Sequence, residues 1–207
     1  MQVQSMFFKR RASEKLADEL LQANMRKAKG KFVDARAKSV LEFGNWEPLR
    51  DYAAKLRDAA LADLDAYLVE FEKNATARGS VVHWAETAEE ACEIIAKIAK
   101  DNGVRKVTKS KSMVSEEVNL NERLEAAGVQ VVETDLGEYI LQLAHEPPSH
   151  IVAPAIHKSK EQVADLFTEA HGKPRITQID ALTREAREQL RGHFLSADMG
   201  ITGSNFL

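Results

Sequence analysis

The sequence predicts an α/β fold, in which a mostly parallel sheet is flanked by helices and preceded by a helical N-terminal segment. Two observations lead to this prediction. From residue 80 onward, short apolar stretches alternate with amphipathic helical patterns, whereas before that point apolar residues recur only with the helical period. Short apolar strands joined by helical crossovers form parallel sheets with helices on both faces. We therefore divide the chain into a helical segment, residues 1–79, and an α/β domain, residues 80–207.

The N-terminal segment is predicted to hold three helices. The first begins at a cap residue, Ser13, and ends at Gly30, and a shorter helix covers residues 34–41. The third has Pro48 in its first turn and carries one apolar stripe that ends before Gly79. The stripe consists of Leu49, Tyr52, Leu56, Ala60, Leu64, Leu68 and Phe71. A stripe of this kind either covers one face of the sheet or docks a partner protein.

The elements of the α/β domain follow from capping residues, periodicity and glycine stops. Strands are expected at residues 81–84, 104–108, 129–133, 150–153 and 198–202. Helices are expected between them, at residues 87–103, 118–128, 136–143, 159–167 and 180–195. Thr87 with Glu90, and Ser159 with Gln162, are placed to cap the starts of two of these helices.

The composition is that of an ordinary globular protein. The 207 residues are 44% hydrophobic and 29% charged, which is enough for one core with a helical appendage. A net charge of −3 gives no electrostatic reason to bind nucleic acid. No apolar run approaches the roughly 20 residues of a membrane span, and the charges near the N-terminus follow the short apolar piece there instead of preceding it. We therefore expect a cytoplasmic protein with neither a membrane span nor a nucleic-acid partner.

Polar motifs follow four of the predicted strands, at the point where each strand ends. They occupy residues 109–117, 134–138, 154–158 and 203–206. Ligands of parallel sheets bind outside the carboxyl ends of the strands. We therefore expect the four motifs to converge on one rim of the sheet, and this rim is the candidate binding site.

Lys109, Lys111 and Ser112 are the predicted anion-binding residues of the rim. Ammonium and hydroxyl donors beside a helix start combine point charges with oriented N–H groups, an arrangement that suits a carboxylate or a phosphate. The alternative is a solvated cationic turn in which Ser112 or Ser115 caps the helix.

The second motif brings three carboxylates to a strand-to-helix turn. Glu133 ends the strand and is a candidate general base. Asp135 is a candidate ligand-binding residue that also suits the role of a helix cap. Because these oxygen ligands come without a metal-binding spacing, we assign no metal site.

The third motif contains His157, the second catalytic candidate. It lies beside Lys158, a candidate ligand-binding residue, at a helix start, where a histidine can donate to an anion or shuttle a proton. His150, which precedes the predicted strand, is more simply a structural residue. The fourth motif adds three ligand-binding candidates, Gly203, Ser204 and Asn205.

Several common active-site signatures are absent from the sequence. It has neither the glycine-rich fingerprint of dinucleotide-binding proteins nor that of P-loop proteins, and no Gly-x-Ser-x-Gly elbow. It has one cysteine, Cys92, whereas a 4Fe–4S cluster ordinarily takes four thiolates. We therefore expect no iron–sulfur cluster or other cofactor within this chain.

Taken together, residues 109–117, 133–139, 148–158 and 200–206 resemble, in the same order, the LUD domain of the lactate utilisation protein B (LutB-like) family of iron–sulfur proteins. The resemblance runs from about Arg11 to the last residue. It implies a fold like that of sugar-phosphate isomerases and CoA-transferases. Members of the family continue into a ferredoxin-like, cysteine-rich region, so the resemblance implies a member shortened before its clusters.

The resemblance also implies a function, namely a part in oxidising L-lactate to pyruvate. The expected partners are other subunits of a lactate utilisation complex, whose iron–sulfur proteins pass electrons onward, and a small carboxylate or phosphate-bearing metabolite. Two alternatives come from different classes. One is a non-catalytic scaffold that docks partner subunits, and the other is a transferase or isomerase that acts on a phosphorylated or CoA-linked small acid.

Overall fold

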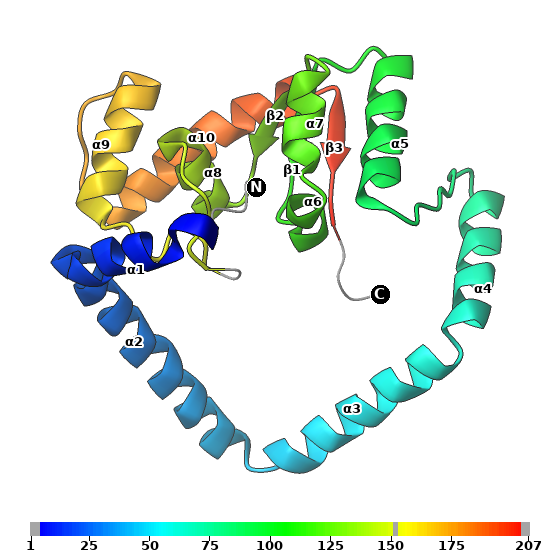
Figure 1. Ribbon diagram of the computed structural model, residues 1–207, viewed down its shortest axis with the longest axis horizontal. Coiled ribbons are helices and arrows are strands. Elements are labelled where there is room, and N and C mark those ends of the chain that lie inside the picture. The colour runs from blue at the N-terminus through cyan, green and yellow to red at the C-terminus, as the bar shows by residue number, and fades with distance from the viewer. Residues whose placement is uncertain (1–4, 151–152, 204–207) are drawn as a thin grey trace. The chain divides into compact units, whose positions relative to one another are not determined.

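The computed structural model describes residues 5–150 and 153–203 (Figure 1). The chain forms two compact units, which we describe separately. One consists of the residues up to Lys27 together with those from Ala85 onward, and the other is Ala28–Trp84. The sheet and the predicted rim belong to the first unit.

The sheet consists, within the described residues, of three parallel strands, β1 (Lys106–Lys109), β2 (Gln130–Glu133) and β3 (Met199–Ile201). Their order is β2-β1-β3, so β1 is central. The register places Lys109 opposite Glu133 on one side and opposite Ile201 on the other. The predicted class, α/β with a parallel sheet flanked by helices, is confirmed.

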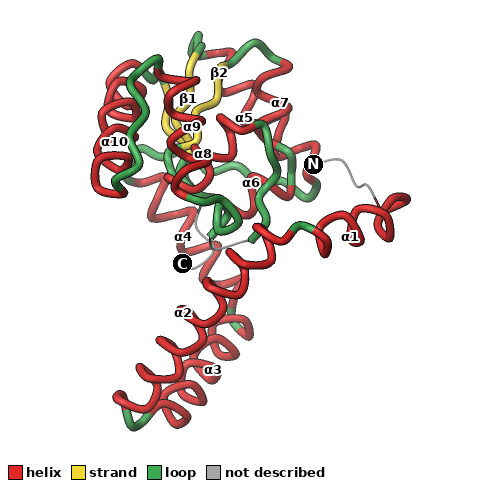
Figure 2. The backbone as a smooth tube through the Cα atoms, turned by 90° about the vertical axis from the view of Figure 1, so that its left-hand side faces the viewer, coloured by secondary structure: helices red, strands yellow, loops and turns green. Residues whose placement is uncertain are grey.

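Helices cover both faces of this sheet (Figure 2). On one face, Val107 and Val131 pack with residues of α5 (Ala88–Asp101) and α7 (Leu120–Ala126). On the other face, Val132 packs with residues of α8 (Leu136–Ala144), α9 (Lys160–His171) and α10 (Ile179–Ser196). Val131 and Val132 join different cores because successive side chains of a strand point to opposite faces. The short helix α6 (Met113–Glu117) follows β1.

The N-terminal part of the chain is helical, as predicted, but its boundaries differ. A 3₁₀ turn (Ser5–Phe7) leads into α1 (Phe8–Ala17), which is followed by α2 (Glu19–Phe43), α3 (Trp46–Ala62) and α4 (Leu64–Ala77). Ser13 is not a cap, because it lies inside α1 and its hydroxyl donates to the Lys9 carbonyl. Gly30 does not end a helix, because the glycine cost of about 1 kcal/mol is too small to interrupt α2. Asp63 divides the predicted long third helix into α3 and α4.

One predicted strand is wrong and another cannot be compared. Residues 81–84 form no strand, and Val81 and Trp84 are 77% and 53% exposed, because no neighbouring strand pairs with them. Ile151 and Val152, the centre of the strand expected at residues 150–153, lie outside the described residues. Among the helices that the structure describes, none is long and apolar enough to cross a membrane.

Candidate functional site

The rim is built on an ion pair between the last residues of β1 and β2. Lys109 Nζ lies 2.8 Å from Glu133 Oε1, and these side chains are 0% and 8% exposed. The strand register sets them side by side, and both point to the face that carries Val107 and Val131. Lys109 is therefore enclosed, and its ammonium is committed to groups of the protein itself.

Two further side chains complete this buried cluster. Lys109 also donates to Ser115 Oγ at 3.0 Å, and Asn121 Nδ2 donates to Glu133 Oε1 at 2.7 Å. Burial raises the pKa of Glu133, while the bonds from Lys109 and Asn121 oppose that rise. Glu133 Oε2 and Asn121 Oδ1 are buried acceptors without a partner in the described structure.

The more accessible cation of the rim is Lys111, whose side chain is 27% exposed. Its Nζ lies 2.6 Å from Glu138 Oε1 and 3.8 Å from Glu116 Oε1. Burial, together with a hydrogen bond to Glu138 and the charge of that residue, raises the pKa of Glu116 to about 7. Burial also opposes ionisation of Glu138, but the bonds from Glu116 and Lys111 outweigh it and lower the pKa of Glu138. Of the two carboxyls, Glu116 is therefore the one that takes up a proton close to neutral pH.

The other polar residues of the first two motifs cap helices. Ser112 Oγ accepts from the Ser115 amide at the start of α6, and Asp135 accepts from the amides of Gly137 and Glu138 at the start of α8. These are the alternative roles that the sequence allowed for Ser112 and Asp135. A ligand-binding role for either residue stays a prediction.

Gly203 brings the fourth motif against the first. A Cβ at Gly203 would lie 2.0 Å from Ser112 Oγ, so only a glycine fits there. The Ser110 amide donates to the Ile201 carbonyl at 2.9 Å, and the Ser110 hydroxyl donates to Thr202 Oγ1 at 2.8 Å. Ser204 and Asn205 lie outside the described residues.

The third motif forms a cluster of its own. His157 bonds through Nδ1 to Ser149 Oγ at 2.7 Å and through Nε2 to Glu146 Oε2 at 3.0 Å, and Lys158 donates to Glu146 Oε1 at 2.5 Å. Lys158 and His157 lower the pKa of Glu146 against the opposing effect of burial. Pro154 of this motif packs against Gly137, because a Cβ on Gly137 would lie 3.0 Å from Pro154 Cγ. No contact in the described structure joins His157 or Lys158 to Lys111.

The structure brings four further side chains into the rim, Ser115, Glu116, Asn121 and Glu138. Glu116 and Glu138 lie within the first and second motifs, and the first turn of α6 brings Ser115 back to the end of β1. Asn121 lies in α7 and has no signal in the sequence. The rim combines two ammonium groups with four carboxyls, so it can hold a ligand carboxylate only if a carboxyl is displaced or protonated.

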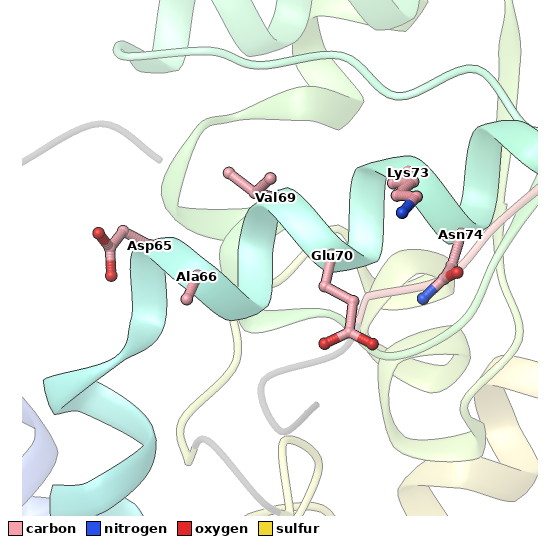
Figure 3. A pocket seen from close by; sticks show the side chains of 6 residues that line it. All are labelled: Asp65, Ala66, Val69, Glu70, Lys73 and Asn74. Atoms are coloured by element: carbon pink, nitrogen blue, oxygen red, sulfur yellow. The ribbon is translucent and has the colours of Figure 1, made fainter.

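The surface also carries hollows outside the rim. A hollow of about 840 Å³ lies between α5 and α7, at the amino ends of β1 and β2. Another, of about 470 Å³, lies on α4 (Figure 3). No group of histidine, cysteine, aspartate and glutamate side chains suited to a metal ion occurs among the described residues.

Fold and rim together define an α/β domain whose polar loops meet at the carboxyl ends of parallel strands. A family model described as "LUD domain" matches residues 68–207, and the chain belongs to this LUD domain family. It is 44% identical to "Lactate utilization protein B" of Macrococcus caseolyticus over the whole chain, and 46% identical to the protein of that name from Bacillus subtilis over 96% of the chain.

It is also 44% identical, over 96% of its length, to a protein of Escherichia coli named "Uncharacterized electron transport protein YkgF". The chain covers 42% to 43% of the length of these relatives, which is less than half. No solved structure matches the chain.

Proposed function

We propose that this chain takes part in L-lactate utilisation, as the LUD domain of an assembly that oxidises lactate to pyruvate and passes the electrons onward. The observation that carries this proposal is the similarity of the entire chain to proteins named for lactate utilisation, at about 45% identity. A relative named as an electron transport protein supports the redox context. Other subunits of a lactate utilisation complex are the proposed partners.

The iron–sulfur clusters that the family resemblance implies do not fit this chain. Cluster ligation ordinarily takes four thiolates, whereas Cys92 is the one cysteine in the sequence. Its thiol is buried and donates to the Val118 carbonyl, and burial raises its pKa, which disfavours the thiolate. In this proposal the electron carriers lie outside the residues of this chain, and this domain binds the small acid.

We place the binding site at the rim, with Lys111 as the group that receives the ligand carboxylate. Lys111 is partly exposed, and Glu138 already occupies it as an internal carboxylate. A ligand carboxylate takes the place of Glu138, and protonation of Glu116 reduces the repulsion that a third negative charge would meet. The Lys109–Glu133 pair lies beneath and holds the two rim loops in position.

Calorimetry with the purified chain tests this assignment, with L-lactate, pyruvate and coenzyme A as separate ligands. We expect L-lactate or pyruvate to bind, and Lys111→Ala to abolish the binding. Lys100→Ala, on the exposed side of α5, is the matched control and should bind as the wild type does. Binding of coenzyme A alone would favour the transferase or isomerase alternative, and binding that survives Lys111→Ala would remove Lys111 from the site.

A further inference from the structure

The helices of the second unit expose apolar side chains that no other part of that unit covers. None of the described residues of α2, α3 and α4 is buried. Phe32 of α2 and Val69 of α4 are 57% and 68% exposed. Helices of this length gain most of their stability from packing an apolar face, and continuous exposed apolar surface marks a site of association.

The unit cannot cover these faces by folding α4 back along α3. An antiparallel helix pair needs a connecting loop of about two to five residues. Between α3 and α4 there is only Asp63. Consequently α4 cannot turn back along α3 to reach α2 of the same chain, so within this unit only a separate molecule could cover its face.

A matched spacing of charged and apolar residues identifies that molecule. In α2, Lys31 and Arg36 bracket Phe32 and Ala35, and in α4, Asp65 and Glu70 bracket Ala66 and Val69 with the same spacing. In paired helices, such charged residues flank the apolar seam and determine which helices associate. The α2 seam is flanked by positive charges and the α4 seam by negative charges.

The α4 seam also carries an open surface hollow. The hollow of about 470 Å³ is lined by Asp65, Ala66, Val69, Glu70, Lys73 and Asn74 (Figure 3). The small side chain of Ala66 leaves room, and the exposed ring of Phe32 lies at the matching position of the α2 seam. Neither Asp65 nor Glu70 belongs to an ion pair within the described residues, and the same holds for Lys31.

We propose that this unit is a homodimer interface, in which the basic seam of α2 in each copy packs against the acidic seam of α4 in the other. A two-fold axis makes the contact twice, because each copy contributes both seams. Phe32 enters the α4 hollow of the second copy, Lys31 and Arg36 lie beside its Asp65 and Glu70, and both seams are covered at once.

Paired charge reversals test the interface in the full chain by sedimentation velocity, from roughly 1 to 100 μM. The wild type should dimerise in this range. The reversal of the basic seam (Lys31→Glu with Arg36→Glu) and that of the acidic seam (Asp65→Lys with Glu70→Lys) should each weaken the dimer by about tenfold or more. An equimolar mixture of the two variants should restore wild-type affinity as a heterodimer, because both contacts again join opposite charges.

Control variants separate this interface from general charge effects. Glu125→Lys with Glu169→Lys reverses two exposed carboxylates of the sheet-bearing unit and should leave the dimer unchanged. Phe32→Ala introduces alanine, which favours helices, so it should weaken the dimer without loss of helicity by circular dichroism. A wild-type monomer at the highest concentration, association that is insensitive to either reversal, or a mixture that fails to associate would each overturn the proposal.

Discussion

Replacing Lys109 by methionine should destabilise the sheet-bearing unit severely, although lysine is ordinarily a surface residue. Methionine fills a similar volume but leaves Glu133, with a side chain 8% exposed, without its counter-charge. Removing one partner of a buried ion pair costs roughly 3–5 kcal/mol. We expect a value near the lower end, about 3 kcal/mol, because burial already raises the pKa of Glu133 and the carboxyl can take up a proton instead of remaining charged.

A double-mutant cycle tests whether this cost comes from the pair. Glu133→Gln with Lys109→Met removes both charges, so the double variant should be more stable than the sum of the two single effects predicts, by roughly 2 kcal/mol. The single variant Lys109→Met should also lose stability as pH rises through the raised folded-state pKa of Glu133. In this variant the folded-state pKa of Glu133 lies above the unfolded value. Between these two pKa values unfolding releases a proton, so a rise in pH favours the unfolded state.

Hydrogen exchange of the amides in β1 and β2 is the appropriate assay. Trp46 and Trp84 both lie in the second unit, so tryptophan fluorescence would not report on the sheet. A folded Lys109→Met variant that loses less than about 1 kcal/mol would refute the reasoning. Simple additivity of the two single changes would refute it as well, because it would mean that the two side chains are not coupled.

Three further predictions concern the rim and one helix start. Carboxylate binding to the chain should tighten as pH falls through about 7, because Glu116 then becomes neutral, and Glu116→Gln should abolish this dependence in calorimetry across pH 6–8. Gly203→Ala should cost about 1–3 kcal/mol in urea unfolding because its Cβ meets Ser112, whereas Gly200→Ala, in open space, should cost less than about 0.5 kcal/mol. Ser159→Ala should cost about 1 kcal/mol, measured in the same way, by removing a capping box.

Much of the fold of the α/β domain follows from local sequence patterns. The strands at residues 106–109, 130–133 and 199–201 lie where short apolar stretches occur, and the capping box of Ser159 with Gln162 forms as the spacing indicates. The strand expected at residues 81–84 fails for a non-local reason. Its pattern suits a strand, but a strand also needs a neighbour to bond with, and the local sequence does not reveal whether one is available.

The site was less predictable, for two physical reasons. Strand alternation puts Lys109 on the same face as Val107, and Glu133 on the same face as Val131, so the burial of the pair was implicit in the period of two. Because lysine and glutamate are ordinarily exposed, the alternation alone did not lead to a prediction that the two side chains are buried. The pairing of Lys111 with Glu138, 27 residues apart, depends on the register between β1 and β2 and leaves no trace in the local sequence.

The buried pair also explains how the rim loops are aligned. Both the amide and the hydroxyl of Thr134 donate to the Lys109 carbonyl at 2.9 Å, so the backbone that leaves β2 is fastened to the end of β1. The Lys109 side chain reaches Ser115 of α6 at the same point. Because one residue ties together the loops that carry Lys111 and Glu138, the contact between those two depends on Lys109, although the Lys109 side chain itself is buried. We therefore propose that lysine at this position acts by positioning the rim loops, and its loss should disturb affinity and stability together.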